Sequence, residues 1–253
     1  MAKGGAKKRI DVILVERGLV QSRERAQAMI LAGNVLVEDV PCTKAGTSFP
    51  EDVVIRLREA DHPYVSRGAL KLKGALETFR IDVKDKLAAD IGASTGGFTQ
   101  VLLEAGVRKV VAIDVGTNQM DWKIRNDPRV ECLEKVNARN LTSEIIRQKV
   151  DIAVIDVSFI SLTKIFPSLF PFVEDAGDVI SLIKPQFEAG REEVGKGGIV
   201  TSETARKESV ERVTDVAKGL GWERVGLIES PITGTDGNIE YLALWKKRRT
   251  DSP

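Results

Sequence analysis

The chain has 253 residues, of which 42% are hydrophobic and 30% are charged, and its formal net charge is +1. This length allows one sizeable hydrophobic core and a small second domain, and the sequence has no run of about 18 apolar residues that would indicate a membrane span. The basic N-terminus runs into an amphipathic segment, so we expect no signal peptide.

Cysteine and histidine are scarce. Cys42 and Cys132 lie far apart and have no metal-ligand spacing, which predicts free thiols in a reducing compartment, the cytoplasm. His62 is the single histidine of the chain, so serine-histidine triads and multi-histidine metal sites are hard to build. We expect chemistry that needs no metal ion.

The first 58 residues predict a small domain of their own. They carry ten Lys and Arg against seven Asp and Glu, a net charge of +3 that suits a polyanion only weakly. Apolar spacing over 9–31 predicts two short helices divided at Gly18, the second opened by Ser22 and closed at Gly33. Runs at 35–40 and 53–57 predict strands.

The order of residues in this domain carries a resemblance. Residues 9–26 read Arg-x-Asp-x-x-Leu-x-x-x-Gly-Leu-x-x-Ser-Arg-x-x-Ala, and the pattern continues to Val37. This resembles the alpha-L RNA-binding domain, named for a small-subunit ribosomal protein, although Glu38 and Asp39 stand where that family usually has Asp/Asn-Gly. The alternative is a solvated helix face. The resemblance implies that RNA phosphates are contacted by Arg9, Arg23, Arg25 and Lys44.

A polar, proline-containing stretch at 59–65 predicts a linker, after which a second domain covers 66–253. Its first helix is predicted over 67–80, with Ser66 as the N-cap. Short apolar runs then alternate with helical patterns, which predicts a doubly wound sheet. The predicted strands are 87–91, 110–114, 130–133, 152–156, 179–183, 225–228 and 240–244.

The last two predicted strands are joined by the loop 231–237 and not by a helix, so the final strand is expected to be antiparallel. The predicted fold class is therefore α/β: a Rossmann-like, seven-stranded sheet of the methyltransferase type with an antiparallel last strand. A small α+β RNA-binding domain precedes it.

A glycine-rich turn follows the first predicted strand of this sheet. Residues 88–99 read Ala-Ala-Asp-Ile-Gly-Ala-Ser-Thr-Gly-Gly-Phe-Thr, and the glycine spacing is neither Gly-x-Gly-x-x-Gly nor a Walker motif. The turn fits S-adenosylmethionine better than a nicotinamide cofactor; a ligand-free strand-helix turn is the remaining alternative. The predicted cofactor residues are Asp90, Gly92, Ala93, Ser94, Thr95, Gly96, Gly97, Phe98, Asp114 for the ribose and Asn137 near the adenine.

Four polar residues are predicted at the working edge of the sheet, because ligands bind at the carboxyl ends of parallel strands. Lys71 lies in the helix before the first strand, Asp156 and Lys184 end the fourth and fifth, and Glu240 is in the last. Lys71 could instead be a surface lysine and Glu240 a solvent-facing strand residue. Lys184 closes an apolar run and precedes a proline, which favours a functional role.

A second resemblance covers nearly the whole chain. The segments 66–72, 90–99, 156–161, 184–188 and 237–241 look like those of the TlyA family, also labelled hemolysin A, which joins the RNA-binding module to an FtsJ-like methyltransferase domain. The resemblance implies 2′-O-methylation of ribosomal RNA on cytidines, in 16S or 23S rRNA or in both, with ribosomal subunits as partners. It also implies a Lys-Asp-Lys-Glu catalytic tetrad of Lys71, Asp156, Lys184 and Glu240. Arg67, in the first segment, is added to the predicted RNA-binding residues.

The chemistry of methyl transfer to a ribose hydroxyl supports the same assignment. The hydroxyl is a poor nucleophile until it loses its proton, and a lysine can accept that proton in its neutral form. We predict Lys184 as this base, with Lys71 favouring its neutral form and steering the oxygen, while Asp156 and Glu240 hold the two ammonium groups. The alternatives are a membrane-lytic protein and a non-catalytic RNA-binding protein.

Overall fold

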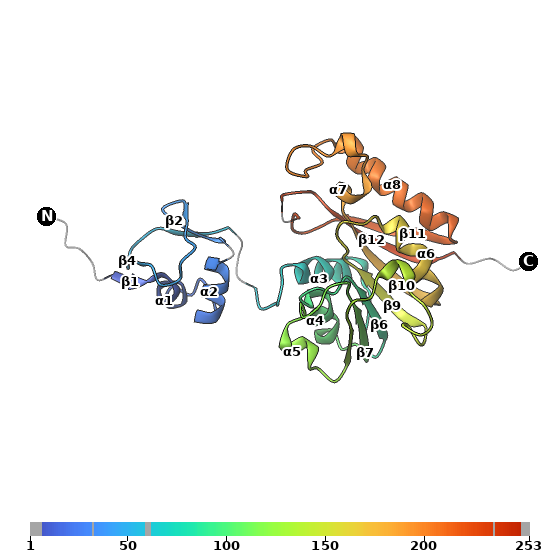
Figure 1. Cartoon of the computed structure of the whole chain (residues 1–253), viewed down its shortest axis with the longest axis horizontal. Coiled ribbons are helices and arrows are strands. Elements are labelled where there is room, and N and C mark those ends of the chain that lie inside the picture. The colour runs from blue at the N-terminus through green and yellow to red at the C-terminus, as the bar shows by residue number, and fades with distance from the viewer. Residues whose placement is uncertain (1–6, 32, 59–61, 235, 249–253) are drawn as a thin grey trace, which may run out of the picture. The chain divides into compact units, whose positions relative to one another are not determined.

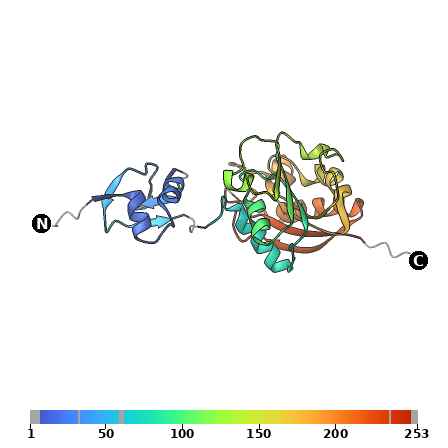
Figure 2. The same cartoon turned by 90° about the horizontal axis from the view of Figure 1, so that it is seen from below.

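The computed structural model describes residues 7–31, 33–58, 62–234 and 236–248. Contacts between Cα atoms divide the chain into two compact units, Met1–Pro63 and Tyr64–Pro253, each of which can be followed in Figures 1 and 2. Residues 59–61 of the predicted linker and residue 235 of the predicted loop lie outside the described residues.

The first unit combines two helices with two small antiparallel sheets. Strand β2 lies between β3 and β5, and β1 pairs with β4. Ser22 caps the second helix as predicted, because its Oγ accepts a hydrogen bond from the Arg25 amide at 3.2 Å. The elements are β1 (Lys7–Arg9), α1 (Ile10–Glu16), α2 (Arg23–Leu31), β2 (Val35–Val37), β3 (Val40–Pro41), β4 (Ser48–Pro50) and β5 (Ile55–Leu57).

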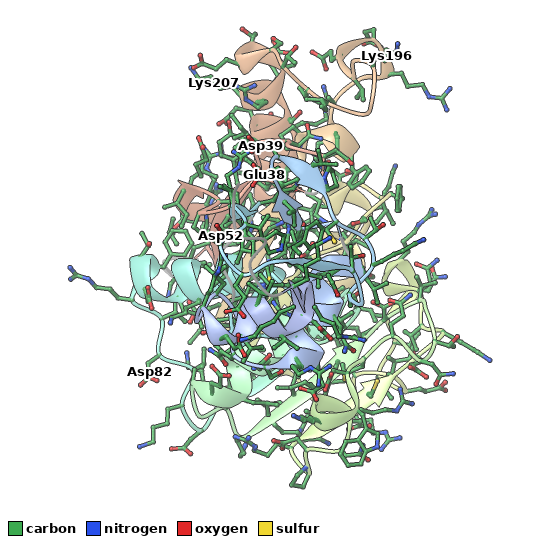
Figure 3. All side chains as sticks on the ribbon, turned by 90° about the vertical axis from the view of Figure 1, so that its left-hand side faces the viewer. Glu38, Asp39, Asp52, Asp82, Lys196 and Lys207 are labelled. Atoms are coloured by element: carbon green, nitrogen blue, oxygen red, sulfur yellow. The ribbon has the colours of Figure 1, made fainter. Side chains whose placement is uncertain are left out.

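The predicted strand 35–40 is confirmed over 35–37 as β2 but ends there, because the chain turns at Glu38 and Asp39. Their φ angles are 49° and 63°. After this turn the chain forms the short strand β3, which pairs with β2 in the antiparallel direction. Two successive positive φ angles are typical of the tight hairpin turn that usually contains Asn-Gly or Asp-Gly. Figure 3 labels both side chains.

A buried carboxylate joins the start of this unit to its second helix. Asp11 is fully buried, and its oxygens accept hydrogen bonds from Arg9 at 3.0 and 2.9 Å and from Arg23 and Gln27 at 3.1 Å each. These hydrogen bonds, led by those of Arg9, hold the pKa of Asp11 well below its usual range. The apolar core beneath includes Ile10 and Ile30.

The second unit is an α/β domain around a seven-stranded sheet, as predicted. Its helices are α3 (Gly68–Phe79), α4 (Gly97–Glu104), α5 (Trp122–Arg125), α6 (Phe166–Leu169), α7 (Pro185–Glu188) and α8 (Glu203–Gly219). Its strands are β6 (Leu87–Ile91), β7 (Lys109–Ile113), β8 (Val130–Leu133), β9 (Val150–Ile155), β10 (Val173–Ile183), β11 (Trp222–Glu229) and β12 (Tyr241–Lys247). Short 3-10 turns are η1 (Ala138–Asn140), η2 (Leu162–Lys164), η3 (Phe170–Phe172) and η4 (Arg191–Glu193).

The strand order is β11-β12-β10-β9-β6-β7-β8. Strand β12 is antiparallel to both neighbours, β10 and β11, which confirms the predicted antiparallel last strand. The other neighbouring pairs are parallel. The chain order reverses between β6 and β9, so loops leaving their carboxyl ends diverge and open a crevice there.

Two apolar layers cover the sheet. Alternate residues of each strand point to opposite faces: Ala88 packs toward α3 and α4, and Ala89 packs toward α6 and α8. The layer on the Ala89 side contains a cluster of four aromatic side chains, Phe166, Phe170, Trp222 and Trp245. Figure 1 shows α8 along β11 and β12 and α4 against β6.

The predicted N-cap Ser66 is a second correction. Helix α3 begins at Gly68, and its N-cap is Arg67, in a helical conformation without a side-chain cap. The backbone carbonyl of Ser66, not its hydroxyl, accepts from the Ala69 amide at 3.2 Å, and its Oγ lies against Gly97. Across the ranges that the structure describes, no helix is both long and apolar enough to cross a membrane.

We predict that Asp11→Ala destabilises the first unit by about 1–3 kcal/mol, because several hydrogen bonds to one buried carboxylate are lost. Since folding lowers the pKa of Asp11, its contribution is present above the pKa of about 4 in the unfolded chain and is lost as pH falls. Hydrogen exchange of residues 10–31 measures this. The exposed Asp52 is the control, and equal protection in Asp11→Ala and Asp52→Ala would contradict the prediction.

Candidate active site

The glycine turn leaves β6 at the crevice where the strand order reverses. The amides of Gly92 and Ala93 both donate to the Ile113 carbonyl, at 2.8 and 3.1 Å, which ties the turn to the end of β7. Gly92 has φ 84°, and a Cβ there would collide with the Asp156 backbone. A side chain at this position is therefore excluded by both conformation and space.

A cavity of about 460 Å³ opens beside this turn. Asp114 faces it, with Oδ2 accepting from the Ser94 amide at 2.8 Å and Oδ1 from the Gly116 amide at 2.7 Å. Asn137 also faces it and caps η1 through the Arg139 amide. The apolar lining is Ile113, Val115, Val136, Ala138, Val157, Phe159, Ile160 and Ile165.

Two of the predicted cofactor residues, Asp90 and Gly96, line neither this cavity nor the smaller cavity that adjoins it. Asp90 is fully buried in β6, where its Oδ2 accepts from the Thr99 hydroxyl at 2.6 Å. Burial raises its pKa to about 7. Gly96 is the N-cap of α4 with φ 93°, packed against Met120 and Ile124. Both residues support the turn from behind.

A second, adjoining cavity of about 260 Å³ contains the four predicted catalytic residues. It shares Gly92, Ser94 and Asp156 with the first cavity. Its lining is Ser66, Arg67, Gly68, Lys71, Gly92, Ala93, Ser94, Thr95, Gly97, Phe98, Asp156, Lys184 and Glu240. Most of the predicted turn residues and all four polar residues therefore meet in one place.

Each lysine of this cavity is paired with its own carboxylate. Lys71 Nζ lies 2.5 Å from Glu240 Oε2, and both side chains are buried, at 7% and 2% exposure. Gln186 Nε2 donates to the other oxygen of Glu240 at 3.3 Å. A Cβ on Gly234 would lie 2.6 Å from Glu240 Oε1, so the loop before β12 packs directly on this carboxylate.

The second pair is closer to solvent. Lys184 Nζ lies 2.6 Å from Asp156 Oδ1 and donates a hydrogen bond to Ser158 Oγ at 2.8 Å. Lys184 is the N-cap of α7, immediately after β10, and Asp156 immediately follows β9. Glu240 precedes β12 and does not lie within it, which corrects the predicted position by one residue.

Sequence reasoning missed Phe159 at the rim of the first cavity. The residue is 91% exposed, its φ is 63°, and its ring centroid lies 5.2 Å from that of Phe187. A positive φ costs free energy for a residue with a side chain, and residues held in such conformations are concentrated at functional sites. No pattern of hydrophobic spacing could have indicated this residue, because it lies outside any regular element.

The predicted RNA-binding residues are placed differently from one another. Arg9 and Arg23, with side chains 48% and 53% exposed, both hold Asp11 while keeping part of the guanidinium in solvent. Arg25 contacts the His62 ring at 3.3 Å, and Lys44 is exposed between β3 and β4. In the second unit, Arg67 lines the tetrad cavity and donates to the Thr233 carbonyl at 2.6 Å.

The residues around the first cavity fit S-adenosylmethionine. Its volume lies in the range of small-molecule sites, and a carboxylate and an amide face it among apolar side chains. Asp114 suits the ribose hydroxyls, the apolar lining suits the adenine, and the glycine turn presents backbone near the second cavity. The residues that line this cavity thus agree with the cofactor that the glycine turn predicts, S-adenosylmethionine.

Comparisons with known proteins agree with this geometry. Residues 64–247 match the FtsJ-like methyltransferase family and residues 8–55 match the S4 domain. The chain is 46% identical to the 16S/23S rRNA (cytidine-2'-O)-methyltransferase TlyA of Mycobacterium tuberculosis, over 96% of this chain and 91% of that protein. It is 42% identical to Hemolysin A of Brachyspira hyodysenteriae, over 93% and 98% of the two chains.

A solved structure of a hemolysin homologue from Streptococcus thermophilus gives the same result, with a TM-score of 0.75 and 43% identity over 98% of this chain and 90% of that chain. Sequence, domain order and fold thus agree over almost the full length. The chain belongs to the FtsJ-like methyltransferases and, among them, to the TlyA family.

Proposed function

We propose that this protein transfers a methyl group from S-adenosylmethionine to a ribose 2′-hydroxyl of ribosomal RNA, on a cytidine of 16S or 23S rRNA or of both. The observation that carries the proposal is the meeting of two lysine-carboxylate pairs with the glycine turn in one cavity. The names of the relatives support the substrate, since the Mycobacterium tuberculosis protein is called a 16S/23S rRNA (cytidine-2'-O)-methyltransferase.

The donor half of the site would hold the cofactor by its three parts. The glycine turn would face the amino-acid part, Asp114 the ribose and Asn137 the adenine edge. When bound, S-adenosylmethionine supplies an activated methyl group and a positive sulfonium charge.

The acceptor half would activate the ribose oxygen. Neutral Lys184 would accept the proton of the 2′-hydroxyl at Nζ, which would leave the ribose oxygen able to attack the methyl group that a bound donor would supply. Asp156 and Ser158 orient the amine, and Asp156 stabilises the ammonium that forms. Lys71, fixed on Glu240, places a positive charge near the developing alkoxide.

The exposed ring of Phe159 would hold the target base. A nucleotide inside an RNA structure must leave its stack before its ribose can enter a narrow cavity, and unstacked bases are commonly held by aromatic rings. Phe159 lies at the cavity rim and is backed by Phe187, whose ring is also 6.0 Å from Lys184 Nζ. Through Phe187, the Phe159 ring therefore lies near Lys184, the proposed general base.

The first unit would deliver the RNA. Arg9 and Arg23 are oriented by Asp11, and Arg25 and Lys44 add positive charge on the same small domain. Phosphate contacts of this kind supply affinity without reading sequence. Ribosomal subunits would be the physiological partners, and the cytoplasm would be the site of action.

The function is tested with labelled methyl donor and three substrates: naked rRNA, each separate subunit and whole ribosomes. Label in a ribose, followed by mapping of the nucleotide, supports the proposal. Donor binding without transfer to any substrate would favour the non-catalytic alternative, and leakage of lipid vesicles treated with pure protein would favour the lytic one.

We predict that Lys184→Ala lowers kcat by about 10²–10⁴-fold, because the general base is lost. Donor affinity measured by calorimetry should change by less than about threefold, since the lysine is not among the residues assigned to the donor. Lys207→Ala on α8 is the matched control (Figure 3). Substantial turnover by Lys184→Ala would remove this residue from the role of base.

We predict that Asp114→Ala raises the Kd for S-adenosylmethionine about tenfold or more, because hydrogen bonds to a charged group are each worth about 1.5–3 kcal/mol. The same carboxylate also holds the amides of Ser94 and Gly116, so the turn loosens as well. Calorimetry measures the change. Asp127→Ala, whose partner is Arg129, is the control, and similar affinities for the two variants would refute the assignment.

We predict that Arg25→Ala combined with Lys44→Ala weakens RNA binding and reduces the slope of log K against log salt by about 2, which is about 1 for each phosphate contact. Fluorescence anisotropy at several salt concentrations measures the slope. Arg56→Ala, which removes an exposed partner of Asp39, is the control. An unchanged slope in the double variant would place the RNA on another surface.

A further inference from the structure

Glu188 is a buried carboxylate that the proposed reaction does not use. It ends α7, four residues after Lys184, and is 5% exposed. Its Oε2 accepts from the Ser161 hydroxyl at 2.5 Å, and its Oε1 accepts from the Leu162 amide at 2.8 Å. Burying a carboxyl group costs free energy, which these hydrogen bonds offset in part.

The surroundings of Glu188 are apolar enough to affect its ionisation. Burial raises its pKa to about 7, against the effects of the Ser161 and Leu162 hydrogen bonds and of the positive charge of Arg212. Arg212 reaches over from α8 and donates to the backbone carbonyl of Glu188. Either ionisation state can keep the contact with Ser161, because a protonated Oε2 can donate to the serine oxygen.

The two hydrogen bonds fasten the far end of the segment that carries the reactive groups. Residues 156–161 leave the end of β9 without regular structure until η2 begins at Leu162. They include Asp156 and Ser158, both in contact with Lys184, and the exposed Phe159. Glu188 holds the segment where it enters η2, and β9 holds it where it begins.

Segment 156–161 and segment 184–188 thus meet at three successive points. Asp156 and Ser158 meet Lys184 at the first, Phe159 meets Phe187 at the second, and Ser161 meets Glu188 at the third. The third is the most buried of these contacts, since Lys184 is partly exposed and Phe159 is 91% exposed.

Backbone strain adds a second reason for such a fastening. Phe159 has φ 63°, a conformation that is unfavourable for a residue with a side chain and persists only where the surroundings impose it. An exposed ring cannot impose it. The fixed points on either side can, and Glu188 supplies the one that lies beyond Phe159.

We propose that Glu188 is a positioning residue for methyl transfer: through Ser161 and Leu162 it holds segment 156–161 in register with Lys184. The effect on the reaction is indirect, because the carboxyl group lies outside both cavities. The inference deepens the proposed function and rests on it for its kinetic consequence. Its structural consequence, the order of segment 156–161, is measurable without catalysis.

The test compares Glu188→Ala, Glu188→Gln and Ser161→Ala in the full-length protein. Glu188→Gln keeps both contacts, since its Oε1 can accept from the Leu162 amide and its Nε2 can donate to Ser161 Oγ. Ser161→Ala keeps the contact of Glu188 to the Leu162 amide but removes the contact to Ser161, together with the hydrogen bond that Ser161 Oγ accepts from the Thr163 amide. The control is Asp178→Ala. Asp178 lies in β10, the strand that precedes Lys184, and its buried carboxylate is paired with Lys86 and Lys246.

For Glu188→Ala we expect kcat to fall about 10- to 100-fold, because small displacements of catalytic groups have effects of this size. The KM for RNA and the Kd for the donor should stay within about threefold. Hydrogen exchange of residues 156–162 should accelerate in Glu188→Ala but not in Glu188→Gln, which should also keep a near-wild-type kcat. Ser161→Ala should give values of kcat and of hydrogen exchange between those of the two Glu188 variants. The test therefore stays decisive even if Glu188→Ala does not fold.

Two results overturn the inference. One is a lower Tm in Glu188→Ala with unchanged kcat of the folded enzyme and unchanged exchange of residues 156–162, the pattern expected of Asp178→Ala. The other is Ser161→Ala behaving as wild type in both measurements. Failure of the proposed function looks different, because the wild-type protein itself would then transfer no methyl group while the exchange measurement still reports on the contact.

Discussion

Two ammonium groups share one narrow cavity, and the site holds together because each is neutralised by its own carboxylate. Lys71 and Glu240 form the deeper pair, and Lys184 and Asp156 the more accessible one. Removing charges from water is costly, and a buried pair is worth that cost only with close geometry and further hydrogen bonds. In the proposed reaction the two pairs have different tasks: the deep pair would provide a fixed field, and Lys184 of the outer pair, once it has lost its proton, would accept one from the substrate.

This charge arrangement depends on where the sheet places its ends. The reversal of strand order between β6 and β9 opens the crevice, and the antiparallel β12 brings Glu240 to the same edge as the carboxyl end of β10. Lys71 comes from α3, outside the sheet, and is held there because α3 packs on the apolar layer that contains Ala88. The fold thus brings residues that are far apart in the chain to one cavity. The proposed chemistry uses these side chains and requires no metal ligand.

Much of the second unit could be predicted from the sequence, because buried parallel strands are short apolar runs whose order is readable. The four polar residues and most of the glycine turn could be predicted from motifs at the ends of those runs. Other features depend on tertiary contacts: the turn at Glu38, the uncapped start of α3 and the extension of β10 through polar residues to Val173. Phe159 and Glu188 lie outside any periodic pattern, and only the fold shows what they contact.

The donor and acceptor halves are proposed to form one site, and a crystal structure of the protein with S-adenosylhomocysteine is the sharpest measurement of that arrangement. We expect the adenosine in the cavity lined by Asp114 and Asn137, and the sulfur directed at the cavity of Lys184 and Lys71. A product molecule whose sulfur points away from both lysines, or one bound elsewhere on the second unit, would contradict it.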